Sequence, residues 1–422
     1  MDKVILGQGV VLEDDLGVSR PNNNQIIVGG SGTGKSTSVL WPTMCHMRES
    51  SFIGTFAKGG EVDAAVQYFK NLGYRTKVWN LATPKENDTL PDPLSYVASD
   101  DDVQQLAKQI SAANPGYQKA TNFDPYWLDT AEGLLTGLIY MVLMTEDHPS
   151  MKKVIDLFYS MKIQEDGQGI KTSLDDCFDW LEKKAPDSVA VRKLNSFRML
   201  PYKTRGCVRD SLEKCIQCMF PLSIQKTMSD KAHLDFGEFA TELTGVLIIT
   251  SPVKAVQYSF ANLLFSIAIR QLMEYADEQE THRLPRPVRL IFDDFSCSFP
   301  ILDYPKMIAT FRSVGISSLM LCQSLSQLSA TYGEDNSTVI LDNCSVMAYF
   351  PGGMNKKTCA YVSEVLNLPL NDVMFMEMAN VVIFQSGKKP KIVPRYQTLS
   401  DPMYQKFLEA GKKQKQKWGR LR

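Results

Sequence analysis

GGSGTGKST, residues 29–37, is the stretch that decides the fold of this chain. It fits the phosphate-binding loop pattern G-x-x-x-x-G-K-[S/T] at every defined position. The loop follows NQIIVGG (24–30), whose β-branched residues predict a buried strand, and it precedes STSVLWPTM (36–44), which can open a helix. A strand, this loop and a helix, in that order, are the setting in which the pattern binds phosphates.

The residue types in this loop each have a physical reason to be there. Glycines allow backbone N–H groups to curve around phosphates. Lys35 is expected to reach the β and γ phosphates, and the Ser36 hydroxyl to ligate Mg²⁺. The sequence therefore predicts ATP and Mg²⁺ as cofactors. The residues expected to bind the nucleotide are Gly29, Gly30, Ser31, Gly32, Thr33, Gly34, Lys35, Ser36 and Thr37.

A second predicted strand, VRLIFDD (288–294), ends in the adjacent carboxylates Asp293 and Asp294. A buried strand that ends in paired acids is costly unless a cation meets the charge. We expect Asp293 to hold the water shell of the Mg²⁺ ion. Asp294 occupies the position at which a motor ATPase needs a general base for the attacking water. The alternative is an acidic surface turn after a core strand.

Two further residues fit the same chemistry. The strand in LMLCQSLSQL (319–328) ends in Gln323, whose amide can bond the γ phosphate or the water; the alternative is a simple strand cap. Arg312 lies in ATFRSVGIS (309–317), just before that strand. In an oligomer Arg312 can serve a neighbour's site as an arginine finger, and otherwise it is a surface arginine.

Composition limits the class of protein. The chain has 422 residues, enough for one large or two to three ordinary domains. Its net charge of −1 excludes polyanion binding by bulk charge, so any nucleic-acid contact needs a local patch. The nine cysteines show no paired framework and indicate free thiols in a reducing cytosol.

Strand and helix signals alternate along most of the chain, which indicates a parallel sheet covered on both faces. Residues 98–235 differ, because they carry many helix signals and few strand signals. We predict an α/β fold, a RecA-like P-loop NTPase domain with an inserted all-α domain. Its expected parts are 1–97 (nucleotide-binding, first part), 98–235 (all-α), 236–400 (nucleotide-binding, second part) and 401–422 (basic tail). The expected strands are 24–30, 51–57, 76–81, 245–250, 288–294, 317–323, 346–350 and 381–387, and the expected helices include 61–72, 257–279 and 304–313.

Three segments bear on membranes and nucleic acid. The apolar run GLLTGLIYMVLM (133–144) is too short to span a bilayer, and no anchor is expected in the chain. The end of the chain, 411–422, has six basic residues and no acid; it is either a frayed end or a contact for a polyanion or membrane surface. The segment 191–205 has five Lys or Arg and two aromatics, which fits either a DNA contact or a solvated helix face.

The chain resembles the TraG-like type IV coupling proteins through most of its length. The similar blocks are 22–44, TFAKGGE (55–61), LPDPLSYV (90–97), 123–143, 284–295 and FRSVGISSLMLCQSLSQLSATYG (311–333). The resemblance implies a hexameric ATPase that brings DNA and protein substrates to a conjugative type IV secretion system. The implied partners are single- or double-stranded DNA, a relaxase and membrane components of the secretion system. The resemblance implies a homo-hexamer when the protein is active, and it leaves open a monomer in isolation. It also implies a cytoplasmic protein that a partner recruits to the inner face of the membrane.

The chain departs from the family pattern in two places near the nucleotide. Phe56 and Ala57 replace an Asp-Pro pair, and the second acid of the acidic strand is Asp294 where the family has Glu. A carboxylate about 1 Å short of its target can cost about 100-fold in rate. The expectation is therefore a P-loop ATPase that is slow, or that depends on DNA or assembly. The alternatives are a nucleotide-bound docking platform with little hydrolysis, or another hexameric DNA translocase.

Overall fold

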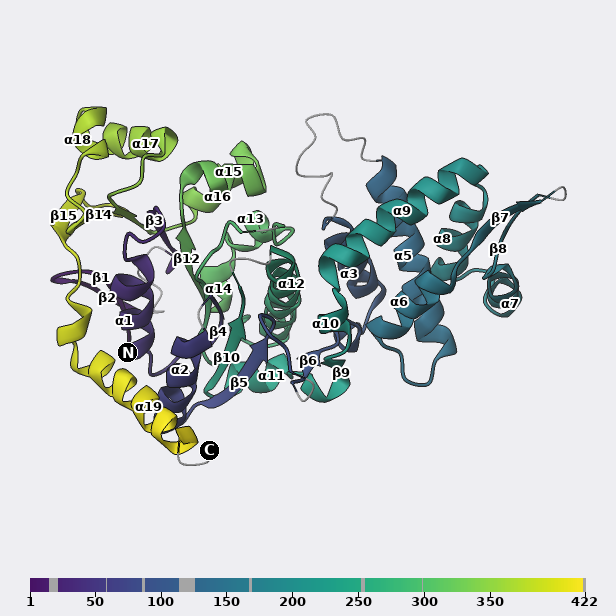
Figure 1. The fold of residues 1–422 in the computed structure, drawn as a ribbon, viewed down its shortest axis with the longest axis horizontal. Helices are drawn as coiled ribbons and strands as arrows, with labels where there is room; N and C mark the ends of the chain where they lie inside the picture. The colour runs from purple at the N-terminus through teal and green to yellow at the C-terminus, as the bar shows by residue number, and fades with distance from the viewer. Residues whose placement is uncertain are drawn as a thin grey trace.

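The computed structural model describes residues 1–14, 22–57, 59–85, 88–113, 126–166, 169–251, 255–297 and 299–419. The chain forms two lobes (Figure 1). One is a large sheet with helices on both faces, and the other is a group of helices from the middle of the sequence. The long helix α12 (Ala255–Asp277) lies between them.

The central sheet has nine strands within the described residues, in the order β15-β14-β13-β3-β12-β11-β4-β10-β5. The seven from β13 to β5 are parallel. Strand β14 pairs antiparallel with β13, and β15 with β14. Their bounds are β3 Gln25–Gly29, β4 Ser51–Phe56, β5 Arg75–Asn80, β10 Thr244–Ile249, β11 Val288–Phe292, β12 Ile316–Cys322, β13 Val346–Phe350, β14 Asn380–Gln385 and β15 Lys391–Pro394.

The antiparallel edge departs from the expected all-parallel sheet. Strand β15 was not predicted, and it follows β14 through a tight turn in which Lys388 N–H donates to Gln385 O at 2.9 Å. Gly387 takes a φ of +74° in this turn. Antiparallel neighbours can be joined by such a short turn, whereas parallel neighbours need a crossover.

The central strands are buried on both faces, which explains their uninterrupted apolar runs. On one face the core continues through α12 into the helical lobe. The other face is covered by α1 (Trp41–Cys45), α2 (Gly59–Asn71) and α19 (Pro402–Gly419). The antiparallel hairpin of β1 (Asp2–Gly7) and β2 (Val10–Asp14) was not predicted from the sequence.

The helical lobe leaves and rejoins the sheet domain at neighbouring points, because β6 (Leu90–Pro91) pairs in parallel with β9 (Met228–Ser229). Helix α5 (Tyr126–Thr145) lies at its centre and packs against α3, α6, α8 and α9. In the described residues it is the one helix whose length and composition suffice to cross a membrane, and half of that stretch is buried inside the protein. The other helices are α3 Asp100–Ser111, α6 Met151–Ser160, α7 Asp175–Lys184, α8 Val189–Arg198, α9 Tyr202–Met219 and α10 Leu222–Gln225.

This lobe is not purely helical. Strands β7 (Ile163–Asp166) and β8 (Gly169–Thr172) form an antiparallel hairpin that projects from the lobe (Figure 1). The segment QEDGQGIKT contains a turn signal, and two strands of four residues are too short to show a clear alternation.

Two other segments differ from expectation. Residues 304–313 form two short helices, α13 (Tyr304–Met307) and α14 (Phe311–Val314), because Thr310 closes a tight turn onto Met307 O through its N–H and its hydroxyl. The expected tail is helix α19 over Pro402–Gly419, which runs beside α2 and α1 (Figure 1). Its Phe407 and Ala410 are buried, because apolar residues at helical spacing precede the basic end.

Candidate nucleotide site

The loop 29–37 leaves the sheet at the end of β3 and turns through two glycines with positive φ. Gly32 has a φ of +75° and Gly34 a φ of +89°. Gly29 is required for space, since a Cβ there would lie 2.7 Å from the Cβ of Phe350. Backbone in the left-handed region and close packing at the strand end both exclude larger side chains.

Lys35 lies inside this loop and is 9% exposed. Its ammonium donates to the carbonyl oxygens of Gly29 and Gly30, the second at 3.0 Å. Burial lowers the pKa of Lys35, and the carboxylates of Asp294 and Asp293 oppose that shift. A buried cation surrounded by backbone fits an anionic ligand such as a phosphate.

The helix after the loop begins with a π-helical turn, Ser36–Leu40, before α1. The N–H of Trp41 donates to Ser36 O, five residues back. Pro42 follows and has no N–H to continue the ordinary ladder. Such turns are common at functional sites, and this one places Ser36 at the mouth of the loop.

The first acid of the acidic strand contacts the loop directly. The Ser36 hydroxyl donates to Asp293 Oδ1 at 2.7 Å. The backbone N–H of Ala57, just after β4, donates to Asp293 Oδ2 at 3.4 Å. Mg²⁺ prefers oxygen ligands such as this hydroxyl from the first turn after the loop and this carboxylate from the end of β11, so these residues fit the predicted ion.

The second acid faces the other way, toward β12. Gln323 Nε2 donates to Asp294 Oδ1 at 3.5 Å. Burial raises the pKa of Asp294 to about 6, and the Asp293 carboxylate acts in the same direction. The bond from Gln323 and the charge of Lys35 oppose this shift. The strand order explains the meeting, because β12 lies between β3 and β11.

Sequence reasoning missed one aromatic neighbour of the acids. Tyr258 of α12 has a buried hydroxyl, and its proximity favours the ionised form of Asp294. An aromatic residue inside a long apolar helix has the same sequence signature as a core residue, so no pattern separated it. Arg395 was also missed, because an arginine near the end of an edge strand has no motif to mark it.

Arg312 does not join this cluster within one chain. It is exposed on α14, which precedes β12, whereas Gln323 follows the last residue of that strand. The carbonyl of Arg312 accepts a bond from Arg283 Nη1 at 3.2 Å. The full length of β12 therefore separates Arg312 from the acids.

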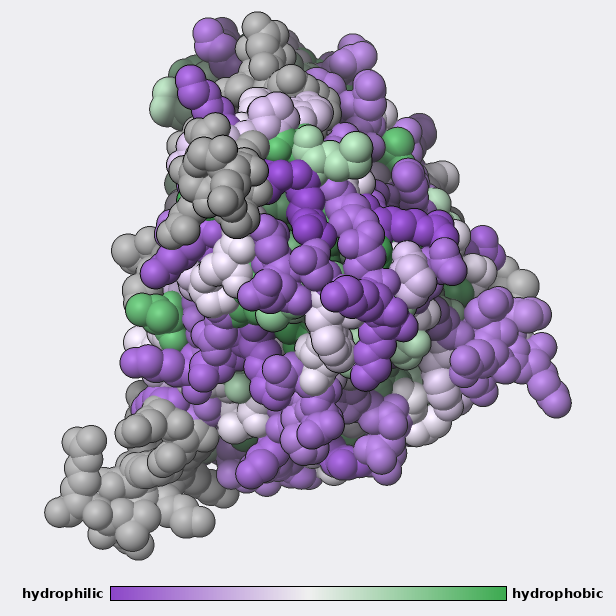
Figure 2. Space-filling model, turned by 90° about the vertical axis from the view of Figure 1, so that its right-hand side faces the viewer, coloured by the Kyte–Doolittle hydropathy of each residue, from purple (hydrophilic) through white to green (hydrophobic). Residues whose placement is uncertain are grey.

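The basic segment 191–205 is less available than its composition indicated. Arg198 makes ion pairs with Asp175, Asp179 and Glu182. Arg205 is buried and donates to the carbonyls of Leu200 and Arg198 at the end of α8. Viewed end-on, the helical lobe is mostly hydrophilic, with apolar groups in small separate patches (Figure 2).

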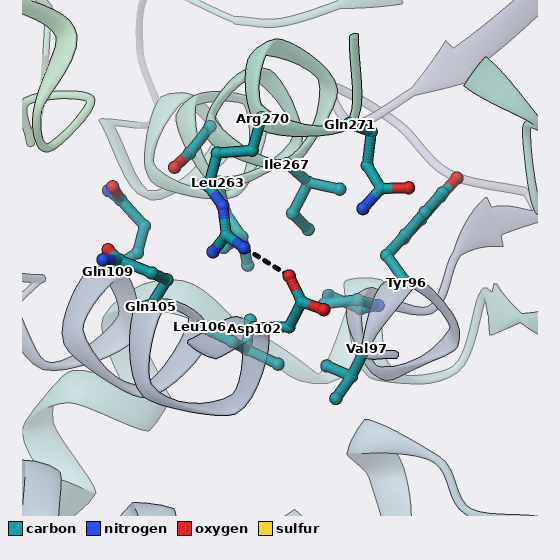
Figure 3. Close-up of a pocket in the computed structure, with 12 residues that line it drawn as sticks. Tyr96, Val97, Asp102, Gln105, Leu106, Gln109, Leu263, Ile267, Arg270 and Gln271 are labelled. Atoms are coloured by element: carbon teal, nitrogen blue, oxygen red, sulfur yellow. Dashed lines mark hydrogen bonds and ion pairs between the residues drawn. The ribbon is translucent and has the colours of Figure 1, made fainter. Parts of the chain in front are cut away.

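A small pocket lies at the junction of the two lobes, away from the loop. Figure 3 shows Arg270 of α12 pointing at Asp102 of α3, with which it forms an ion pair. Asp102 also accepts the N–H groups of Ala98 and Ser99 at 3.0 and 2.9 Å in a capping box. The charged groups of this pocket pair with one another, and their ion pair joins α3 to α12.

Comparison with known proteins places the chain. Residues 7–367 match the family described as type IV secretory system conjugative DNA transfer. The chain belongs to this family. No protein with a curated description matches it.

Solved structures share the fold at low sequence identity. The bacterial conjugative coupling protein TrwBdeltaN70, in its unbound monoclinic form, has a TM-score of 0.70 and 14% identity, covering 96% of this chain and 92% of that one. TrwB in complex with the non-hydrolysable ATP analogue ADPNP has a TM-score of 0.68 and 13% identity, covering 93% and 88%. VirB4 of Thermoanaerobacter pseudethanolicus has a TM-score of 0.56 and 14% identity, covering 95% and 97%. The α/β fold with an all-α domain is thus confirmed.

Proposed function

We propose that this chain is an ATP-hydrolysing coupling protein that delivers DNA and a bound relaxase to a conjugative type IV secretion system. The observation that supports hydrolysis is the meeting of three strand ends at one edge of the sheet. There Ser36 contacts Asp293, and Gln323 contacts Asp294. The TrwB structures with ADPNP and with ADP and Mg²⁺ support the same ligands here.

Each residue has a proposed role. The loop 29–37 binds the phosphates, and Lys35 neutralises charge on the β and γ groups. Ser36 and Asp293 hold Mg²⁺, which, when bound, draws charge from the phosphate oxygens. Asp294 accepts a proton from the attacking water, and Gln323 orients that water or Asp294 itself. Arg312 acts on a neighbouring subunit's nucleotide, since it lies far from its own.

The assembly and partners are proposed from family membership. A homo-hexamer would bring Arg312 of one subunit toward the site of the next, while the chain alone can be a monomer. Single- or double-stranded DNA, a relaxase and membrane components of the secretion system are the proposed partners. Recruitment from the cytoplasm to the inner face of the membrane would then depend on one of these components. In this proposal, residues 1–97 and 236–400 bind the nucleotide, and residues 98–235 face the substrate.

The test is ATP hydrolysis by the purified chain, alone and with single- or double-stranded DNA. We expect slow turnover that DNA stimulates and that Lys35→Ala abolishes. Asp294→Glu should raise kcat by up to about 100-fold, because the longer side chain restores the reach of the base. Asp294→Asn is the matched control and should lose the slow turnover of the wild type, because an amide does not accept the proton.

The same assay separates the second candidate function. ATP binding without turnover under any condition, in both wild type and Asp294→Glu, would favour a nucleotide-bound docking platform. That candidate is favoured by Asp294 itself, which is shorter than the family's Glu and is bonded to Gln323.

A further inference from the structure

The C-terminal segment after β15 is fastened to the nucleotide loop. The Thr398 hydroxyl donates to Thr37 O at 2.7 Å, which joins this segment to the helix that follows the loop. The N–H of Arg395 donates to Ala379 O at 2.9 Å. The first bond ties the segment to the helix after the loop, and the second holds the backbone of Arg395 itself against Ala379.

The guanidinium of Arg395 lies over the loop with part of its hydrogen-bonding capacity unused. Its Cζ is 5.4 Å from the centre of the Phe350 ring, and its Nη1 is 3.0 Å from where a Cβ on Gly34 would stand. Nε and Nη2 of Arg395 are buried and have no hydrogen-bond partner in the described part of the chain. Leaving buried donors unmade is costly, so the arrangement indicates a ligand that completes it.

The unused atoms have a specific geometry. Nε and Nη2 form one edge of the guanidinium, the edge that donates two parallel bonds to a phosphate or carboxylate. The aromatic ring of Phe350 holds the plane of that edge, which lowers the entropy lost on binding. An anion with two oxygens is the ligand this edge fits, while Nη1 of the same guanidinium faces Gly34.

The position of Arg395 in the sheet distinguishes it from the acids. Phe350 ends β13, which flanks β3 on one side, whereas Gln323 and Asp294 follow β12 and β11 on the other side. The groups proposed for hydrolysis are therefore gathered on the β12 side of the loop. Arg395 approaches from the β13 side, at Gly34 and close to Thr37.

We propose that Arg395 binds the α-phosphate of the nucleotide, a phosphate that is not transferred, through the Nε–Nη2 edge. This inference rests on the proposed nucleotide-binding function and deepens it. Because ATP and ADP share the α-phosphate, Arg395 contributes equally to the binding of both and does not sense hydrolysis. It is a binding residue delivered by a segment more than three hundred positions away in sequence from the loop.

The experiment measures the Kd of ADP and of a non-hydrolysable ATP analogue by titration calorimetry in the presence of Mg²⁺. Arg395→Gln should weaken both nucleotides by the same factor, about tenfold to 100-fold, the range of charge-assisted bonds. Arg395→Lys keeps the charge but loses the paired donors, so it should recover part of the affinity. Arg209→Gln is the matched control, since Arg209 stacks on Phe158 at 5.3 Å in the helical lobe and should change neither Kd.

The outcomes separate the two levels of inference. Unchanged affinity in Arg395→Gln, or a loss for the ATP analogue alone, overturns the α-phosphate assignment. Failure of wild type to bind either nucleotide, with Lys35→Ala no different, is a failure of the proposed function instead. Melting curves without nucleotide check that each variant is folded. If Arg395→Gln does not fold, the Kd values of Arg395→Lys decide the test.

Discussion

At the scale of single residues, two adjacent acids are separated by their partners. Asp293 accepts bonds from Ser36 and from Ala57, so it faces the loop and β4. Asp294 faces Gln323 on β12 and is the acid whose pKa burial raises to about 6. One residue step along a chain turns a side chain to a different neighbour, and here that step separates the proposed metal ligand from the proposed general base.

This separation gives a prediction for Asp293. Asp293→Asn removes the carboxylate that we propose holds Mg²⁺ but keeps the size of the side chain. We expect the Mg²⁺ concentration for half-maximal hydrolysis to rise by about tenfold or more. Loss of a residue that binds a metal, directly or through a ligand, typically weakens metal affinity by at least that factor. ADP binding measured in EDTA should be unchanged. An equal loss of ADP affinity with and without Mg²⁺ would contradict the assignment of Asp293 to the metal.

At the scale of elements, the packing of α5 on α8 depends on one glycine. A Cβ on Gly137 would lie 2.6 Å from Leu194 Cδ2, whereas a Cβ on Gly133, one turn earlier, would meet Lys193 Cδ at 3.9 Å. The two glycines occupy the same helix but have different surroundings. Gly137 permits the close approach, and Gly133 has no such reason to be glycine.

The pair gives a matched stability prediction. Gly137→Ala should lower the free energy of unfolding by about 1–3 kcal/mol through overpacking against Leu194. Gly133→Ala should raise it by about 0.5–1 kcal/mol, because alanine loses less backbone entropy in a helix. Denaturant unfolding of both variants measures the difference. Equal effects of the two substitutions would show that the α5–α8 contact does not require glycine at position 137.

At the scale of the whole molecule, helix α19 closes the second face of the sheet. The Phe407 ring lies 5.2 Å from Trp41 and 5.9 Å from Tyr68, which belong to α1 and α2. A Cβ on Gly411 would lie 2.8 Å from Ala64 Cβ, so α19 and α2 are in close contact there. The C-terminal helix therefore stabilises the elements that follow the nucleotide loop.

Truncation tests this role. A chain that ends at Asp401 should lose several degrees of melting temperature, because Trp41 and Tyr68 become exposed to water. A chain that ends at Lys412 retains Phe407 and Ala410 and should melt like the full chain. The second truncation also tests the basic end for DNA contact, since it removes most of the positive charge there. Equal melting of both truncations would contradict the role of α19.

Local sequence by itself determined the loop 29–37, the two acids after β11 and the alternation of strands and helices. These features depend on residue type and local spacing. They can therefore be predicted from glycine, lysine and paired carboxylates without knowing which distant residues pack against them. The fold class followed, because buried parallel strands need continuous apolar runs. The TraG-like resemblance is confirmed by the family match over residues 7–367.

Only the tertiary structure decided which strand ends meet. It placed β12 between β3 and β11, so that Gln323 reaches Asp294, and it put Arg312 at the opposite end of β12. It paired β14 and β15 at the edge and brought Arg395 over Gly34. The physical reason is that these contacts depend on strand order and on side-chain burial across long separations. An arginine with two buried, unpaired donors has the same local sequence signature as one in solvent, and only its surroundings distinguish them.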